Sequence, residues 1–317
     1  MTKLYSLNFL KVLFFILIVF HHSIDFYNSY LCVEGFFMIS GLLIYYTQKE
    51  RRVIDAFKKR IFSIYPYYFV GLTLLIIFTY FFDKSKMYSN LFEAIVEYSI
   101  LQSFFNTYSI NYPMWFLSVL VFVSPIGLIL IKKLSKKNLI IFSSIFIMIV
   151  YVLLCYLGGI EQWKNLFGFI PLSALRGFAA LLMGVIIGIL RESIKSGKWN
   201  NICEVLLLTA FIWLLFIKNT VVEFVLIAII FLLVLTSSLE NSLLTKIGNS
   251  KIVSFLNNQQ LTAYINHALV ISVFNAIFKD CQINKYLKVA IILIILYAFS
   301  YLLNKIIALS IEVIKKR

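Results

Sequence analysis

Long apolar segments, separated by short polar ones, dominate the chain. Each of these segments carries few charges over about the 20 residues that a helix needs to cross the hydrocarbon core of a bilayer. The short alternating segments of a transmembrane β-barrel are not visible. We therefore predict an all-α polytopic membrane helix bundle, with a single domain over residues 1–317. About ten transmembrane helices are expected, over residues 7–24, 30–47, 64–82, 113–131, 139–156, 168–190, 203–217, 221–239, 261–279 and 287–311.

The composition agrees with this pattern. The 317 residues are 62% hydrophobic and only 14% charged, whereas roughly a quarter of the residues of a soluble domain are charged. Backbone polar groups in lipid must be paired inside the protein, which a helix achieves within its own segment. We therefore expect a multi-pass protein with no soluble domain.

The formal net charge of +15 could suggest a nucleic-acid partner, but the distribution of the charge argues against one. With the N-terminus in the cytoplasm, nineteen Lys and Arg residues fall on the cytoplasmic side and seven on the outer side. This asymmetry follows the positive-inside rule. We expect both termini in the cytoplasm, an excess charge that orients the chain and contacts anionic lipid, and no nucleic acid.

Lys11 and His22 bracket the apolar core of the first predicted helix. Eleven steps of about 100° bring His22 about 20° beyond three full turns from Lys11, so both side chains share one face. With a rise of about 1.5 Å per residue they lie roughly 16 Å apart along the axis. Lys11 is expected near the cytoplasmic end and His22 near the outer end, while His21 points about 100° away.

Glu34 lies about one turn inside the outer end of the second predicted helix, at about the depth of His22. A short hairpin joins the two helices, so we expect Glu34 to contact His22. A carboxylate beside an imidazole would raise its affinity for a proton and fix its tautomer. That arrangement suits a general base.

Two further ionisable residues fall inside predicted helices, where burial is costly and usually functional. Arg176 is expected in the outer half of the sixth helix, and His267 in the middle or inner half of the ninth. Structural interpretations stay open for each residue: Lys11 could extend to the inner headgroups, His22 could lie at the outer interface, Arg176 could form a structural ion pair, and His267 could be a hydrogen-bonded packing residue.

Three other features predict structure more than chemistry. Gly184 and Gly188 form a GxxxG pattern that is typical of close helix packing. The four cysteines show no zinc-type spacing, so we expect no metal site. Residues 83–112 form the longest stretch between predicted helices and are expected to include an interfacial or partly buried helix on the outer side.

Together these residues resemble the integral-membrane acyltransferase-3 family. The first helix of that family carries a basic residue, ten further residues and a histidine, as Lys11 and His22 do here. Five other elements follow in the family's order. They are matched by Val33, Glu34, Phe36, Phe37, Ser40 and Gly41; by Lys59, Arg60, Pro66 and Tyr68; by Trp115, Phe116 and Leu117; by Arg176, Gly184 and Gly188; and by Tyr264 and His267.

The resemblance implies an acyl-CoA-dependent O-acyltransferase of a bacterial plasma membrane. Such an enzyme transfers an acyl group, usually acetyl from acetyl-CoA, to a hydroxyl of a cell-surface or lipid-linked carbohydrate. An alcohol needs a general base to attack a thioester at neutral pH, and His22 is our candidate, oriented by Glu34. Arg176 would stabilise charge on the thioester oxygen or hold the donor, and Lys11 completes the catalytic set. The expected substrate-binding residues are Ser40, Lys59, Arg60, Trp115, Tyr264 and His267.

The donor and the acceptor would approach from different places. Acyl-CoA is anionic and cytoplasmic, and the basic loop predicted at 48–63 offers it positive charge. The carbohydrate could wait on a lipid carrier at either face. No SGNH-type esterase domain follows in the sequence, so we expect the membrane domain to complete the transfer or to pass the acyl group to a separate protein.

Two alternatives of other classes stay open. A transporter or flippase for a polysaccharide precursor would also place charges near the middle of the membrane, although inverted repeats are not visible in this sequence. A structural partner of a polysaccharide synthase would need no catalytic residues at all.

Overall fold

The computed structural model describes residues 4–24, 27–47, 50–105, 107–160, 166, 170–194, 197–279 and 281–315. These residues form helices and their connections, with a single isolated bridge between Leu166 and Ile170 and no β-strand in the described part. The predicted all-α class is confirmed.

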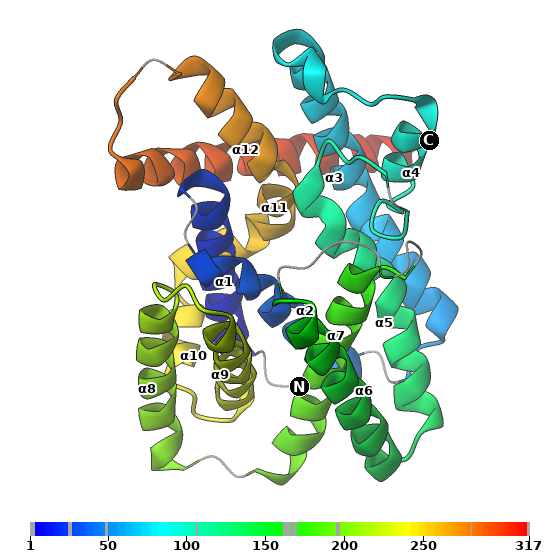
Figure 1. Cartoon of the computed structure of the whole chain (residues 1–317), viewed down its shortest axis with the longest axis vertical. Coiled ribbons are helices and arrows are strands. Elements are labelled where there is room, and N and C mark those ends of the chain that lie inside the picture. Colours follow the sequence, from blue (N-terminus) through cyan, green and yellow to red (C-terminus); the bar gives the residue numbers. More distant parts are fainter. Residues whose placement is uncertain are drawn as a thin grey trace.

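Ten long helices within the described residues correspond to the ten predicted ones (Figure 1). They are α1 (Tyr5–Ile24), α2 (Cys32–Thr47), α3 (Val53–Phe82), α5 (Trp115–Lys133), α6 (Lys136–Tyr156), α7 (Leu172–Ser193), α8 (Lys198–Leu214), α9 (Thr220–Ser238), α11 (Lys251–Ile277) and α12 (Lys285–Lys315). Short elements join them: η1 (Tyr27–Leu31), η2 (Lys84–Lys86), α4 (Leu91–Tyr98), η3 (Tyr112–Met114) and α10 (Leu244–Gly248).

Eight of the described helices are long and apolar enough to cross a membrane, and α8 adds a shorter apolar helix. The outward faces of these helices agree with a lipid environment. Phe62 on α3 and Met148 on α6, for example, are largely exposed on the bundle surface, where lipid tails rather than water would cover them. The protein is therefore a multi-pass membrane bundle.

Two helices begin well before the predicted positions. The prediction of a basic loop over 48–63 is wrong from Val53 onward, because α3 already starts there. The segment has no Gly or Pro, and an Arg52–Asp55 ion pair of 2.8 Å lies at its start, which supports a helix N-terminus. The second early helix, α11, starts at Lys251. The side chain of Ser250 caps it by accepting a hydrogen bond from the amide of Val253, which favours a helix start there.

The most extensive helix contact in the described part of the chain joins α2 and α7, and glycines make it possible. A Cβ atom at Gly41 would collide with the backbone carbonyl of Leu181, and one at Gly184 would collide with that of Met38. Gly188 faces the ring of Tyr45 one turn further along. The predicted packing role of the GxxxG pattern is confirmed, and it holds the two helices in register.

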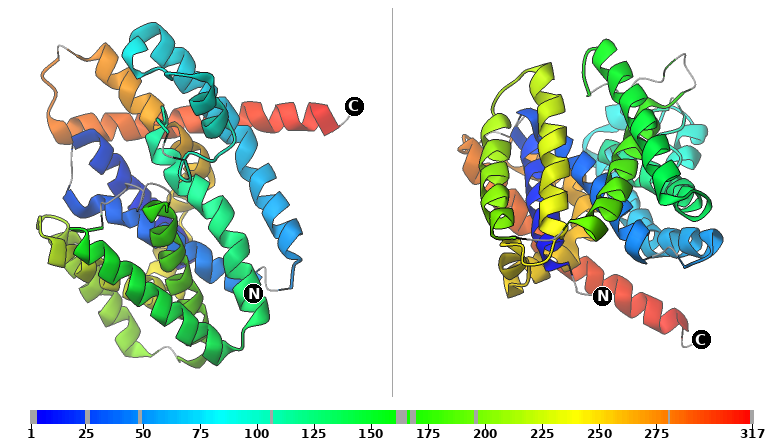
Figure 2. Two further views of the ribbon diagram at one scale, coloured as in Figure 1. Left: turned by 45° about the vertical axis from the view of Figure 1, so that its right-hand side comes forward. Right: turned by 90° about the horizontal axis from the view of Figure 1, so that it is seen from below.

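The last helix is placed differently from the others. In Figure 1, α12 lies across the bundle rather than along it, and its C-terminal part extends beyond the other helices in both views of Figure 2. It packs mainly on α11 and also contacts α1 and α3.

Candidate active site

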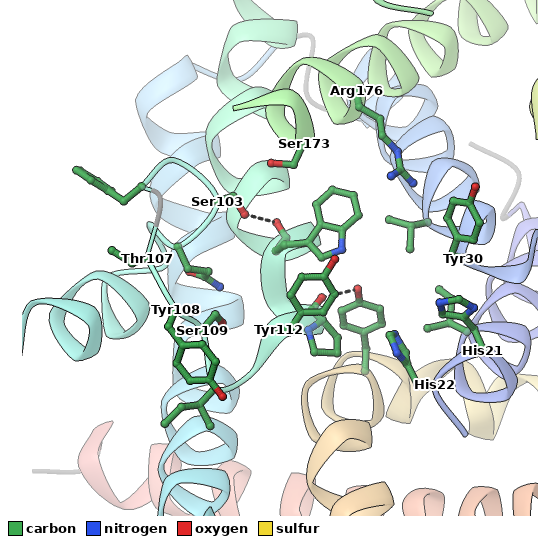
Figure 3. Close-up of a pocket in the computed structure, with 18 residues that line it drawn as sticks. His21, His22, Tyr30, Ser103, Thr107, Tyr108, Ser109, Tyr112, Ser173 and Arg176 are labelled. Atoms are coloured by element: carbon green, nitrogen blue, oxygen red, sulfur yellow. Dashed lines mark hydrogen bonds between the residues drawn. The ribbon is translucent and has the colours of Figure 1, made fainter. Parts of the chain in front are cut away.

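A cavity of about 710 Å³ opens where α1, α2, α5, α7 and α11 converge with the segment that follows α4 (Figure 3). Its size is typical of a small-molecule site. Four of the residues predicted from the sequence line it, namely His22, Trp115, Arg176 and Tyr264. Residues from five helices thus meet at one place, although they are far apart in the sequence.

His22 lies at the end of α1 with its side chain exposed to the cavity. The ring of His267 lies behind it, with the ring centres 5.1 Å apart. His267 is completely buried, and its Nδ1 donates a hydrogen bond of 2.5 Å to the carbonyl oxygen of Tyr264. The prediction that His267 lies deeper in the membrane than His22 is wrong, because the early start of α11 brings this residue level with His22.

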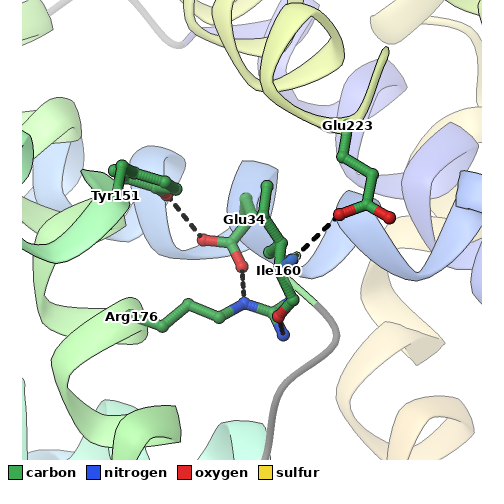
Figure 4. Close-up of polar contacts among 5 residues, drawn as sticks. All are labelled: Glu34, Tyr151, Ile160, Arg176 and Glu223. Atoms are coloured by element: carbon green, nitrogen blue, oxygen red, sulfur yellow. Dashed lines mark hydrogen bonds and ion pairs between the residues drawn. The ribbon is translucent and has the colours of Figure 1, made fainter. Parts of the chain in front are cut away.

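Glu34 forms an ion pair with Arg176 instead of the expected contact with His22 (Figure 4). Neither side chain reaches solvent freely, with Glu34 0% and Arg176 6% exposed. Tyr151 of α6 donates a hydrogen bond of 3.3 Å to the second oxygen of Glu34. The prediction that Glu34 contacts His22 is wrong. The close packing of α2 and α7 at their glycines brings Glu34 and Arg176 together two helical turns away. A buried charge there needs a partner of opposite sign.

The other end of the guanidinium group binds the backbone of Ile160, in the connection between α6 and α7. Nη1 of Arg176 donates a 2.9 Å hydrogen bond to the carbonyl of Ile160, and the amide of the same residue donates one of 2.9 Å to Glu223 of α9. The guanidinium also lies over the ring of Trp115, at 5.2 Å from the ring centre. Nη2 has no hydrogen-bond partner among the described residues. This nitrogen is left for a group in the cavity.

Tyr151 and Glu223 help to hold Arg176 in place, and neither was predicted from the sequence. Tyr151 is an ordinary aromatic residue within an apolar helix, and nothing in the pattern marks it. Glu223 is the one acidic residue in the first turn of an otherwise apolar helix, α9, and that position could have drawn attention to it.

Glu97, at the end of α4, was also missed, and it fixes one wall of the cavity. Its buried carboxylate accepts hydrogen bonds from the hydroxyls of Tyr88 and Ser109 and from the amides of Ile110 and Asn111, at 2.7–2.9 Å. These bonds hold the cavity-lining segment, within the predicted 83–112 region, against α4. Partial burial raises the pKa of Tyr108 in this wall, so its phenol stays protonated at neutral pH.

The remaining predicted residues lie away from the cavity lining. The amino group of Lys11 is 3.5 Å from Oδ1 of Asn8, on the first turns of α1. Lys59 is exposed on α3, whereas Arg60 is half-buried beside Pro125 of α5. Ser40, on α2, does not line the cavity either. The structure thus brings together the outer residues of the predicted set and leaves Lys11, Ser40, Lys59 and Arg60 apart from them.

A family model described as an acyltransferase domain matches residues 4–307. The chain belongs to the acyltransferase-3 family. The match includes every motif from which the resemblance was drawn, so that resemblance is confirmed and the protein is a membrane acyltransferase. No curated protein and no solved structure shows a significant match to the chain.

Proposed function

We propose that this protein transfers an acyl group, acetyl in the simplest case, from acyl-CoA to a hydroxyl of a carbohydrate. The observation that carries the proposal is the cavity bordered by His22 on α1 and by Arg176 on α7. Figure 3 shows the two side chains directed toward the same space from different helices. A base and a cation on facing walls are the two groups that acyl transfer to an alcohol requires.

The lining of the cavity suits a carbohydrate acceptor. Aromatic rings of Tyr108, Tyr112 and Trp115 offer flat surfaces to a sugar ring, and several hydroxyl groups surround them. Oε1 of Gln102 and Oγ1 of Thr107 are buried and have no hydrogen-bond partner among the described residues. Buried polar atoms are normally paired, so we assign these two to hydroxyl groups of the acceptor.

In this reaction His22 accepts one proton and later donates it. The imidazole takes the proton of the acceptor hydroxyl while the oxygen attacks the carbonyl carbon of the thioester. A tetrahedral intermediate forms, its carbon–sulfur bond breaks, and the imidazolium returns the proton to the departing CoA thiolate. The products are the acylated carbohydrate and CoA.

Arg176 would stabilise the negative charge that develops on the thioester oxygen. Its Nε is bound by Glu34 and its Nη1 by Ile160, so the guanidinium is held in place before the substrate arrives. Preorganised donors of this kind lower the barrier because they need no rearrangement during the reaction. Nη2 is the nitrogen that can donate to the oxyanion.

The donor would enter from the opposite end of α1. Lys11 lies roughly 16 Å from His22 by helix rise, a gap that an extended pantetheine arm would bridge. The exposed Lys59 and the half-buried Arg60 at the start of α3 would then bind the phosphates of CoA, which are strong acceptors for such groups. The proposal therefore has the N-terminus in the cytoplasm of a bacterium and the chain in its plasma membrane.

Transfer by the purified protein tests this function. The intact protein in lipid nanodiscs is mixed with radiolabelled acetyl-CoA and a panel of lipid-linked glycans. We expect label in at least one glycan with the native protein and none with the His22→Ala variant. Absence of transfer, together with loss of exported polymer in cells that lack the gene, would favour the transporter instead.

A further inference from the structure

Nε2 of His267 is buried and has no role in the acyl transfer proposed above. The carbonyl oxygen of Tyr264 can only accept a hydrogen bond, so Nδ1 of His267 must carry the proton of the ring. In a neutral imidazole the other nitrogen, Nε2, is then an acceptor. Nε2 is buried and has no hydrogen-bond partner among the described residues. An acceptor left unpaired in the interior is costly.

Among the described rings in contact with His267, one can supply a donor to this acceptor. Three described rings surround it, with centres at 5.1 Å for His22, 5.4 Å for Tyr264 and 6.1 Å for Phe15. Phe15 has no polar atom. The hydroxyl of Tyr264 already donates to the carbonyl of Pro113 at 2.9 Å. His22 is therefore the ring that can supply an N–H group.

We propose that His267 is the positioning partner of His22, in the place where the sequence suggested Glu34. A small rotation of either ring would bring a nitrogen of His22 to Nε2 of His267, and catalytic hydrogen bonds often shorten only when substrate binds. This inference rests on the proposed function, since it assigns a partner to the base of that reaction.

The partnership fixes which nitrogen of His22 reacts. Its N–H group points at Nε2 of His267, so the lone pair of the other nitrogen points at the acceptor hydroxyl in the cavity. When His22 takes the hydroxyl proton, the hydrogen bond to His267 becomes one from a charged donor and strengthens. His267 itself gains and loses no proton, and the proton passes from the acceptor to His22 and then to the thiolate.

Other titratable groups near His22 are already engaged or lie across the cavity. Glu34 is paired with Arg176. The ring of His21 packs edge-to-face against that of His22, with the ring centres 5.1 Å apart. The remaining described groups of this kind around the cavity are Tyr30, Tyr108, Tyr112, Arg176 and Tyr264. His267 differs from them because it lies behind His22 rather than in the space for substrate.

Two substitutions at the same position separate positioning from packing. In His267→Asn the side-chain amide can still donate to the carbonyl of Tyr264, but no atom reaches the place of Nε2. In His267→Gln the longer amide can put an acceptor oxygen there. The control is Tyr297→Phe, which removes a buried hydroxyl without a partner in the described chain from another ring that packs on Phe15.

The experiment measures kcat, the KM for acetyl-CoA and the pH–rate profile of acyl transfer by full-length protein in nanodiscs. For His267→Asn we expect kcat to fall about 10- to 100-fold, the rate equivalent of a hydrogen bond to a charged group, with KM unchanged. The acidic limb of the profile should move to lower pH, because the protonated form of His22 loses a stabilising acceptor. His267→Gln should recover part of the rate, and Tyr297→Phe should match the native protein.

Other outcomes overturn the proposal. A native rate and profile in His267→Asn would do so, and equal losses in the Asn and Gln variants with an unmoved profile would show a packing role only. If His267→Asn does not fold, His267→Leu is measured in its place with the same expectations. A native protein that transfers no acyl group would refute the proposed function itself, so the two failures are distinct.

Discussion

Glu34 of α2 and Arg176 of α7 form an ion pair that is buried between the two most closely packed helices of the bundle. In the sequence, Glu34 and His22 resembled one catalytic unit, but this ion pair gives them separate roles. Glu34 holds the cation, and His22 stands on the other side of the cavity with His267. Each of the two groups that we propose for acyl transfer therefore lies beside a buried residue of its own, Glu34 or His267.

Glu34→Gln should reduce both turnover and stability. Removing one partner of a buried ion pair typically costs about 3–5 kcal/mol, because the other charge stays behind unpaired. We expect a clear drop in the unfolding temperature in detergent and a lower kcat. Asp83→Asn is the control, since it breaks the exposed pair with Lys86 and such pairs contribute about 1 kcal/mol or less. Equal stability of the two variants would contradict the role of the buried pair.

Tyr151→Phe should lower kcat by about tenfold, the rate equivalent of one net hydrogen bond, while acyl-CoA binding stays unchanged. The variant removes only the hydroxyl that holds Glu34, so Arg176 loses part of its orientation. Tyr156→Phe, on the same helix with an 86% exposed side chain, should have no effect. The result is read from kcat and KM measured side by side, and a change confined to KM would count against this positioning role.

Gly184→Ala should prevent close packing of α2 and α7. The new methyl group would meet the backbone of Met38, which has no room to yield, so helix separation and loss of folded protein are expected. Gly197→Ala is the matched control because nothing lies within 4 Å of its added carbon. Size-exclusion chromatography of the two solubilised variants makes the comparison, and a monodisperse Gly184→Ala protein with native activity would contradict it.

The orientation of the chain predicts which side chains an impermeant thiol reagent reaches. In a variant whose four native cysteines are replaced by Ser, a cysteine at Ser89 should react in intact cells and one at Ser135 should be protected. Both positions are exposed on the bundle surface, so burial does not distinguish them. The reverse pattern would place the N-terminus outside and would move the proposed donor side with it.

Much of the fold could be predicted because membrane helices leave a direct signal in the sequence. Apolar length predicted the long helices, and spacing predicted that Arg176 and His22 lie on the same side of the membrane; both line one cavity. Depth by residue count failed for His267, because the polar run from Asn257 to Gln260 interrupts the apolar pattern in the first turns of α11. The partner of Glu34 could not be predicted, since helix neighbours depend on contacts such as that of Gly41 with Leu181.

The general-base role of His22 is tested most directly by comparing the activity of His22→Ala with that of His21→Ala. Both residues border the cavity, but only His22 is proposed as the general base, and removal of such a base typically costs about 10²–10⁴ in rate. Acyl transfer is measured with both variants at equal protein levels in the same nanodiscs. We predict that His22→Ala loses its activity by at least 10²-fold while His21→Ala keeps much of it. Equal losses in the two variants, or an active His22→Ala protein, would contradict the general-base role of His22.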